Sequence, residues 1–201
     1  RLFVRDLNEK RYREKLPDMI YDRIGDIILA LYIQVSSTSE CFTSSRVQKR
    51  VFARWNREKK EVMQDALQNT LRMAPPRLYS WEKLLTMPAY KGEDFMDPSG
   101  KGELSRDAYG NCISTSRRVN GAVCVFLPGV AKYIAGILND DLYCAFTSIH
   151  EVMVHARETV ATADLREVLK DTILETTPSE DILSYHIYRY DRESDSFSME
   201  L

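Results

Sequence analysis

The fold is best predicted from residues 120–151, which read NGAVCVFLPGVAKYIAGILNDDLYCAFTSIHE. Asn120 and Gly121 form the dipeptide that most readily makes a two-residue hairpin turn. The apolar run 122–127 that follows is rich in β-forming residues and predicts a buried strand. Apolar side chains then recur at helical spacing over residues 130–138, which predicts a short amphipathic helix packed beside that strand.

The second part of this stretch predicts two more strands. Residues 139–141 are a helix-ending turn, and residues 142–146 form a buried apolar run. Thr147 and Ser148 then turn the chain into a strand that begins at His150. Strands joined by so short a turn must be antiparallel. We therefore expect an α+β protein with mostly antiparallel sheets and helices packed on one face.

The remaining sequence suggests two sheet-bearing halves joined by a linker. Residues 88–110 are rich in glycine, proline and charged residues, with too few apolar side chains to offset the entropy of ordering them. They separate an N-terminal α+β half, residues 1–87, from a C-terminal α+β half, residues 111–201. Residues 88–110 are therefore predicted to be a flexible linker or an excursion from one domain.

Several shorter elements are predicted within these halves. Residues 2–4 begin a strand, Asn8 is a plausible N-cap for a helix over residues 9–16, and residues 26–35 have the β-branched content of a central strand. Residues 185–190 alternate as in a strand, with Ile187 on the face opposite to Tyr188 and Tyr190.

Composition limits the class of protein. The 201 residues carry 28 basic and 30 acidic side chains, so the formal charge is −2 and any charge argument must be local. The longest apolar run falls far short of the roughly 20 residues that a membrane span needs. The cysteines, Cys41, Cys112, Cys124 and Cys144, are widely spaced, as expected for reduced thiols. We expect a soluble, cytoplasmic protein without a cofactor.

Three segments resemble a known family. They are NGAVCVFLPGV, DLYCAFTSIHEV and ILSYHIYRYDR, and in order and spacing they are similar to DUF5688, an uncharacterised bacterial family common in anaerobic gut bacteria. The resemblance spans nearly the whole chain and is weakest across residues 88–108. It implies bacterial origin and fold kinship, and it carries over no catalytic residue because none is established for the family.

Histidine and glutamate side chains are the candidates for catalysis. His150, Glu151 and His155 lie within six positions, and His186 is the remaining histidine. On a strand His150 and His155 point to opposite faces, so a zinc site of the H-E-x-x-H kind is not expected. Ser148 with His150 lacks the usual nucleophile elbow. Glu151 with His150, or with His186 on an adjacent strand, is the arrangement left open for a hydrolase.

The basic segment 46–60, RVQKRVFARWNREKK, is the candidate for nucleic-acid binding. We expect a helix ending near Trp55 and a second helix over residues 57–69. On such a helix the basic side chains would form a stripe that could contact phosphates, while an exposed tryptophan could stack on a base. The alternative is a surface helix whose arginines pair with acids. The candidate binding residues are Arg46, Lys49, Arg50, Arg54, Trp55 and Arg57.

No catalytic, metal or cofactor motif is complete, whereas aromatic and arginine side chains of the interface type are plentiful. The sequence therefore favours a non-catalytic binding or regulatory protein with a protein partner, and the resemblance to DUF5688 implies a protein encoded in a mobile element. Nucleic-acid binding through residues 46–60 and hydrolysis through Glu151 are the alternatives. We expect a monomer or a weak homodimer that does not associate with membranes.

Overall fold

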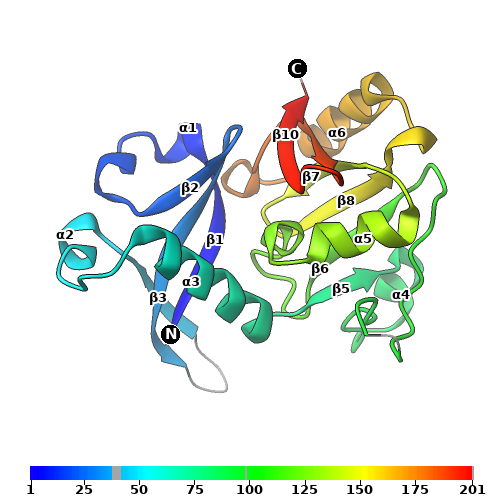
Figure 1. The fold of residues 1–201 in the computed structure, drawn as a ribbon. Coiled ribbons are helices and arrows are strands. Elements are labelled where there is room, and N and C mark those ends of the chain that lie inside the picture. The colour runs from blue at the N-terminus through cyan, green and yellow to red at the C-terminus, as the bar shows by residue number, and fades with distance from the viewer. Residues whose placement is uncertain (38–41, 98, 201) are drawn as a thin grey trace.

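The computed structural model describes residues 1–37, 42–97 and 99–200, which form two antiparallel sheets (Figure 1). The first sheet has the order β1-β3-β2, and β4 also pairs with β3. Its strands are β1 (Leu2–Asn8), β2 (Tyr21–Ile24), β3 (Ile27–Ser37) and β4 (Phe42–Arg46). The strands expected at residues 2–4 and 26–35 are confirmed as parts of β1 and β3.

The second sheet has six strands in the order β10-β9-β7-β8-β6-β5, all paired antiparallel. They are β5 (Pro76–Tyr79), β6 (Asn111–Thr115), β7 (Leu142–Ser148), β8 (Glu151–Ala156), β9 (Ile187–Asp191) and β10 (Ser196–Glu200). The α+β class with antiparallel sheets is therefore confirmed. Strand β5 belongs to this sheet although it lies within residues 1–87, so the division into halves at residues 88–110 stays a prediction.

Six α-helices and four 3-10 helices connect the strands in the described chain. The α-helices are α1 (Glu9–Tyr12), α2 (Lys49–Phe52), α3 (Lys59–Met73), α4 (Trp81–Thr86), α5 (Val130–Leu138) and α6 (Thr162–Thr176). The 3-10 helices are η1 (Leu16–Asp18), η2 (Ala122–Phe126), η3 (Arg157–Thr159) and η4 (Ser179–Asp181). None of the helices in the described residues is long and apolar enough to cross a membrane.

Helices cover both faces of the six-stranded sheet, rather than the single face expected. On one face Tyr143, Ala145 and Ile187 pack against Leu165 and Leu169 of α6. The opposite face belongs to the main core, which includes η2 and α5. Because strands β7 and β9 are buried on both sides, each face needs apolar cover.

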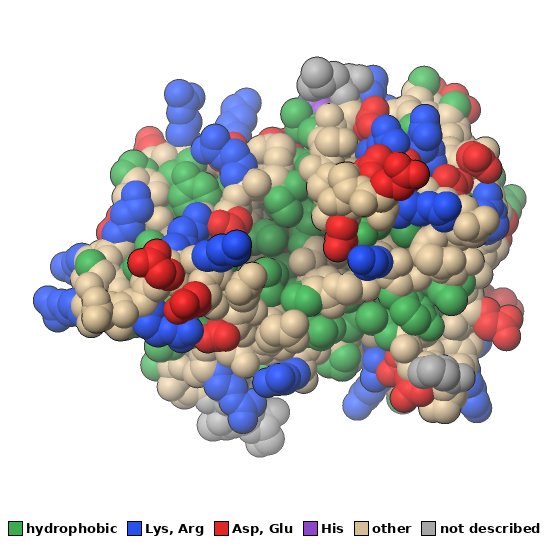
Figure 2. Space-filling model, in the orientation of Figure 1, with side chains coloured by type: hydrophobic (Ala, Val, Ile, Leu, Met, Phe, Trp, Pro, Cys, Tyr) green, Lys and Arg blue, Asp and Glu red, His purple; other side chains and the backbone are tan. Residues whose placement is uncertain are grey.

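The main core runs without interruption from one sheet to the other. It joins Val4 and Leu29 of the first sheet and Val62 of α3 to Val123 of η2 and Tyr188 of β9. Figure 2 shows hydrophobic side chains gathered at the surface between α3 and α5, where the two parts meet. Burial of this shared apolar surface stabilises the arrangement of the two sheets.

The prediction of a strand over residues 122–127 is wrong, since this run forms the 3-10 helix η2. Asn120 has a positive φ of 49°, but Gly121 has a φ of −86°, so the two do not form the hairpin turn that requires positive φ at both positions. Gly121 lies against Ser114 and the backbone of His150, where a β-carbon would collide. The run is apolar because it fills the space between the sheets.

The predictions for helix α1 and strand β9 are confirmed, with different boundaries. Helix α1 ends at Tyr12 and so is shorter than residues 9–16, although Asn8 does cap it by accepting a hydrogen bond from the Arg11 backbone at 2.9 Å. Strand β9 begins at Ile187, two residues later than expected. Its predicted alternation is confirmed, because Ile187 packs with α6 whereas Tyr188 and Tyr190 enter the main core.

Three of the four cysteines are described, and each is a buried free thiol: Cys112, Cys124 and Cys144. Burial raises the pKa of all three thiols, so they resist ionisation and behave as packed apolar side chains. Cys41, and Pro98 of the predicted linker, lie outside the described residues. Within that linker Phe95 is buried in the main core, so part of the segment packs against the fold.

Candidate functional site

A polar cavity of about 360 Å³ lies where the turn between β7 and β8 meets α4 and the segment after α6. His150 and Glu151 come from this turn and the start of β8, and Asp181 comes from η4. Trp81 of α4 and Arg118, from the loop after β6, complete the wall. The cavity thus brings together two of the residues predicted as catalytic candidates.

His150 is held by contacts at both ring nitrogens. Its Nδ1 accepts a hydrogen bond from the backbone N–H of Asn120 at 3.1 Å, and its Nε2 lies 3.5 Å from Asp181 Oδ2. A neutral imidazole with its proton on Nε2 fits both contacts. Ser148 Oγ accepts a hydrogen bond from the His150 backbone at 3.0 Å, and no bond joins it to the ring among the described contacts. The imidazole is therefore not placed as a base for Ser148.

Glu151 is bonded to neighbours other than a histidine. Its Oε1 accepts a hydrogen bond from Thr147 Oγ1 at 3.0 Å, and its Oε2 lies 3.8 Å from Cys112 Sγ. Within the described residues no hydrogen bond or ion pair joins Glu151 to His150, although both line the cavity. The structure therefore places the predicted pair in one cavity without the direct contact that acid–base catalysis by the pair requires.

The other two histidines lie elsewhere. His186 Nε2 is 3.9 Å from Asp26 Oδ2, at the contact between the two sheets, and His186 does not line the polar cavity. His155 of β8 is buried and faces α6, together with Met153 two positions earlier on the strand. The structure therefore does not join His186 to Glu151 in one site.

The prediction of a continuous basic helix that ends near Trp55 is wrong. Arg46 ends strand β4, α2 covers only Lys49–Phe52, and α3 begins at Lys59. Asn56, with a positive φ of 49°, lies in the break between the helices. The predicted arginine stripe is therefore interrupted. Pairing of Arg46 with Tyr32 in the β3–β4 ladder is the long-range contact that overrides the local helical pattern.

Several residues of the basic segment 46–60 are engaged within the protein. Arg57 Nη2 lies 2.9 Å from Asp65 Oδ2, and Lys59 Nζ lies 2.7 Å from Asp22 Oδ1. Trp55 packs against Phe52 and the main core, so its ring is not freely presented. Lys49, Arg50 and Arg54 remain exposed on the described surface. Nucleic-acid binding by this segment stays a prediction.

Helix α4, which supplies Trp81 to the polar cavity, exposes apolar side chains. Trp81 is 54% exposed, Leu85 is 86% exposed and Met87, just after the helix, is 53% exposed. Ser80 caps the helix by accepting a hydrogen bond from the Lys83 backbone. The spacing of Trp81 and Leu85 puts them on one helical face. Sequence pattern alone could locate this apolar pair, but it could not show that the face points outward.

Arg118 adds a cation to the wall of the polar cavity. Its guanidinium lies over the Tyr79 ring at 5.6 Å from the ring centroid. Among the described residues no carboxylate lies within ion-pair distance of Arg118, whereas nearby Lys83 pairs with Glu93 and Arg77 pairs with Asp94. We name Trp81, Leu85, Met87 and Arg118 the α4 surface.

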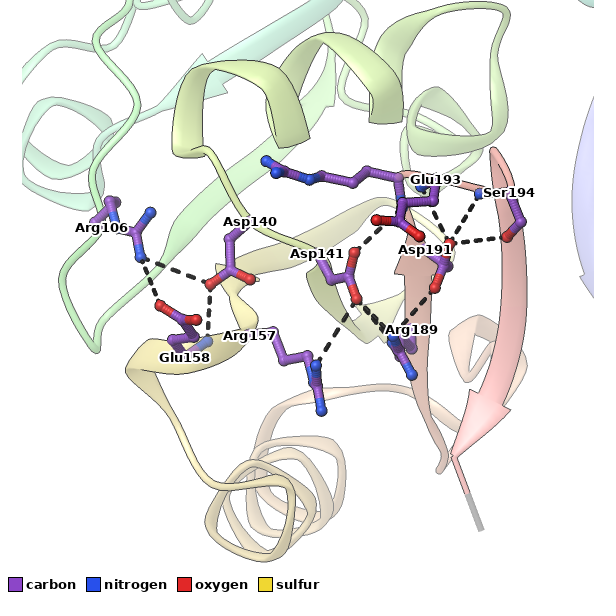
Figure 3. A network of polar contacts seen from close by, with 10 residues as sticks. Arg106, Asp140, Asp141, Arg157, Glu158, Arg189, Asp191, Glu193 and Ser194 are labelled. Atoms are coloured by element: carbon purple, nitrogen blue, oxygen red, sulfur yellow. Dashed lines mark hydrogen bonds and ion pairs between the residues drawn. The ribbon is translucent and has the colours of Figure 1, made fainter.

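A separate polar network surrounds Asp140 and Asp141 (Figure 3). These residues follow the end of α5, as predicted, where Asn139 has a positive φ of 50°. Asp141 Oδ2 lies 2.6 Å from Arg189 Nη2, and Asp140 Oδ2 accepts a hydrogen bond from the Glu158 backbone at 2.9 Å. Each carboxylate is thus paired within the protein, which indicates that the network fixes the ends of strands β7 and β9.

Comparison with known proteins gives a family without an assigned activity. A family model described as "Family of unknown function (DUF5688)" matches residues 1–192. No curated protein and no solved structure matches the chain. Any statement about function therefore depends on the chemistry of this molecule.

Proposed function

Since the chain belongs to the DUF5688 family, whose function is unknown, we propose from its surface chemistry that it is a non-catalytic binding protein that acts on another protein. The observation that carries this proposal is the exposure of three large apolar side chains within residues 81–87, on and just after α4: Trp81, Leu85 and Met87. Single apolar residues at a surface are ordinary, but a tryptophan with two large apolar neighbours is typical of an interface centre.

The chemistry of the partner follows from the charges around this surface. Arg118 has no carboxylate partner in the described structure, whereas Arg77 pairs with Asp94 and Lys83 pairs with Glu93. A partner that places an acidic side chain against Arg118 and apolar side chains against Trp81 and Leu85 would complement both features. The α4 surface therefore fits a protein segment that combines acidic and apolar residues.

Two features favour binding over hydrolysis at the neighbouring cavity. His150 has both nitrogens engaged, and Glu151 is bonded to Thr147 rather than to a histidine. A partner side chain that enters the cavity would contact hydroxyl groups and carboxylates, but it would not meet a histidine hydrogen-bonded to Glu151 as an acid–base pair. We propose that the cavity receives a polar side chain of the same partner.

Site-specific photo-crosslinking in the source cells tests this proposal. A photoreactive phenylalanine analogue at position 85 should crosslink one defined protein, and the same analogue at Ile137 of α5, which is also exposed, should not. The crosslink at position 85 should disappear when Arg118→Glu is added, because that change puts like charges together. Identical products from positions 85 and 137, or crosslinking to nucleic acid alone, would contradict the proposal.

A further inference from the structure

A second cavity, of about 450 Å³, lies between α6 and the sheet, on the face opposite to η2 and α5. Ala145 and Met153 form the sheet side of this α6 groove, and Leu165 and Leu169 form the helix side. Its volume falls within the roughly 300–1,000 Å³ that is usual for small-molecule sites, and its walls are mostly apolar as in such sites.

The inner wall of the α6 groove carries one buried polar side chain, His155. It is 5% exposed, and its Nδ1 has no hydrogen-bond partner among the described residues. Burial lowers the pKa of His155, so the imidazole is neutral at neutral pH. Native proteins rarely leave a buried polar atom unpaired, and a bound molecule is one way to satisfy it.

The position of this imidazole is fixed by Gly110. A β-carbon built on Gly110 would lie 2.4 Å from His155 Cε1, and the φ of Gly110 is +72°. The backbone therefore packs directly on the ring, as only glycine allows. Tyr109, the residue before it, is 89% exposed, and Val168 on the facing helix is 62% exposed. Two large apolar side chains thus stand at the mouth of the groove without cover.

The charge of the α6 groove limits its occupant. Asp164 is the one lining residue with a formal charge once His155 is neutral, and it lies exposed in the first turn of α6. The positive end of the helix dipole offsets part of that charge. The buried walls at His155, Leu165 and Leu169 carry no charge, so an ionised group held among them would lose its hydration without gaining an ion pair.

We propose that the α6 groove binds a small uncharged organic molecule with one aromatic or aliphatic ring and a hydroxyl or N–H group. The ring lies between Met153, Leu165 and Leu169, and the donor group faces His155. The α6 groove contains neither Trp81 nor Arg118, and Thr147 is the lining residue that it shares with the polar cavity beside the α4 surface.

Titration of the full chain with three ring compounds tests this site. Phenol, benzoate and benzylamine have similar rings but differ in charge. Phenol should shift the NMR signals of the Met153, Leu165 and Leu169 methyl groups saturably, and the two charged compounds should bind at least about tenfold more weakly. Absence of a saturable shift with phenol, or equal binding of a charged compound, would overturn the proposal.

A change at the mouth separates groove binding from adhesion elsewhere. Val168→Trp should block the groove and abolish the phenol-induced shifts, whereas Val168→Ala should preserve them. Because Val168 is exposed, both variants should retain the thermal unfolding midpoint of the unmodified protein within a few degrees. Phenol binding that persists unchanged in a folded Val168→Trp variant would place the ligand outside the α6 groove and contradict the proposal.

Discussion

Tyr188 Oη donates a hydrogen bond to Asp26 Oδ1 at 2.5 Å, which joins the six-stranded sheet to the turn between β2 and β3. Ser184 Oγ donates to the same carboxylate oxygen at 2.7 Å, and the Asp26 backbone donates to Tyr188 Oη at 3.0 Å. Gly25, with a φ of +57°, brings this turn against the tyrosine ring. The two sheets are thus connected by a polar contact as well as by the shared core.

The Tyr188→Phe variant should be less stable than the unmodified protein. Removal of the hydroxyl leaves Asp26 with fewer donors at a part-buried position, which should lower the free energy of unfolding by about 1–3 kcal/mol. Urea denaturation followed by circular dichroism measures the change. Tyr185→Phe, at an exposed tyrosine nearby, is the matched control and should have little effect. Equal stability of the two variants would show that the contact between the sheets contributes nothing.

Burial of the Asp6 carboxyl group predicts an unusual dependence of protein stability on pH. Its side chain is fully buried, its carboxylate oxygens have no partner in the described structure, and burial raises its pKa to about 7. The folded protein keeps a proton that the unfolded chain releases near its ordinary pKa of 3.8. The contribution of Asp6 is therefore complete below about pH 4 and is lost as pH rises through 7.

This contribution could reach about 4 kcal/mol, since each pKa unit corresponds to about 1.4 kcal/mol. The Asp6→Asn variant removes the titrating group, so it should be more stable than the unmodified protein at pH 8 and should vary less between pH 5 and pH 8. Urea unfolding at both pH values measures this. A variant whose stability changes with pH as much as that of the unmodified protein would assign the effect to other groups.

Gly110→Ala should destabilise the protein. The new methyl group would overlap the His155 ring and force alanine into a positive φ, which should cost about 2 kcal/mol. Gly136→Ala is the matched control, because a β-carbon at that position in α5 has no heavy atom within 4 Å. The control should gain up to about 1 kcal/mol through helix propensity. A similar thermal unfolding midpoint for the two variants would contradict the close packing of Gly110.

The basic segment gives a test of the alternative function. The double variant Arg50→Glu, Arg54→Glu should fold normally, because exposed surface charges contribute little stability. Titration of both proteins with single- and double-stranded DNA and RNA at two salt concentrations should show no tight, salt-sensitive binding by either. Tight binding by the unmodified protein that is lost in the variant would favour a nucleic-acid interface.

Much of the fold follows from local patterns in the sequence. Alternation predicted the opposite faces of Ile187 and Tyr188. A short turn expected at Thr147 and Ser148 predicted antiparallel pairing of β7 with β8, which is confirmed, although the turn itself lies at residues 149–150. The apolar run 122–127 was predicted to be a strand but forms the 3-10 helix η2. A short apolar run is compatible with either a buried strand or a buried helical segment, so its sequence alone does not distinguish them. The close approach of Gly121 to Ser114, which excludes the hairpin, is a tertiary contact.

The candidate site was less predictable than the fold. Sequence proximity suggested His150 and Glu151, and both do line one cavity. The bonds of His150 to the Asn120 backbone and Asp181 depend on segments about 30 residues away on either side, so spacing could not reveal them. Likewise, the helical spacing of Trp81 and Leu85 predicts a common face, but only tertiary packing decides whether that face is covered.

The affinity of the crosslinked partner, once purified, for the Trp81→Ala variant tests the central claim most directly. Truncation of an interface tryptophan typically costs 2 kcal/mol or more, so the affinity should fall by about 30-fold or more. Ile137→Ala, at an exposed residue of α5, should leave the affinity within about twofold. If Trp81→Ala binds the partner as tightly as Ile137→Ala does, the α4 surface is not the interface and the account is contradicted.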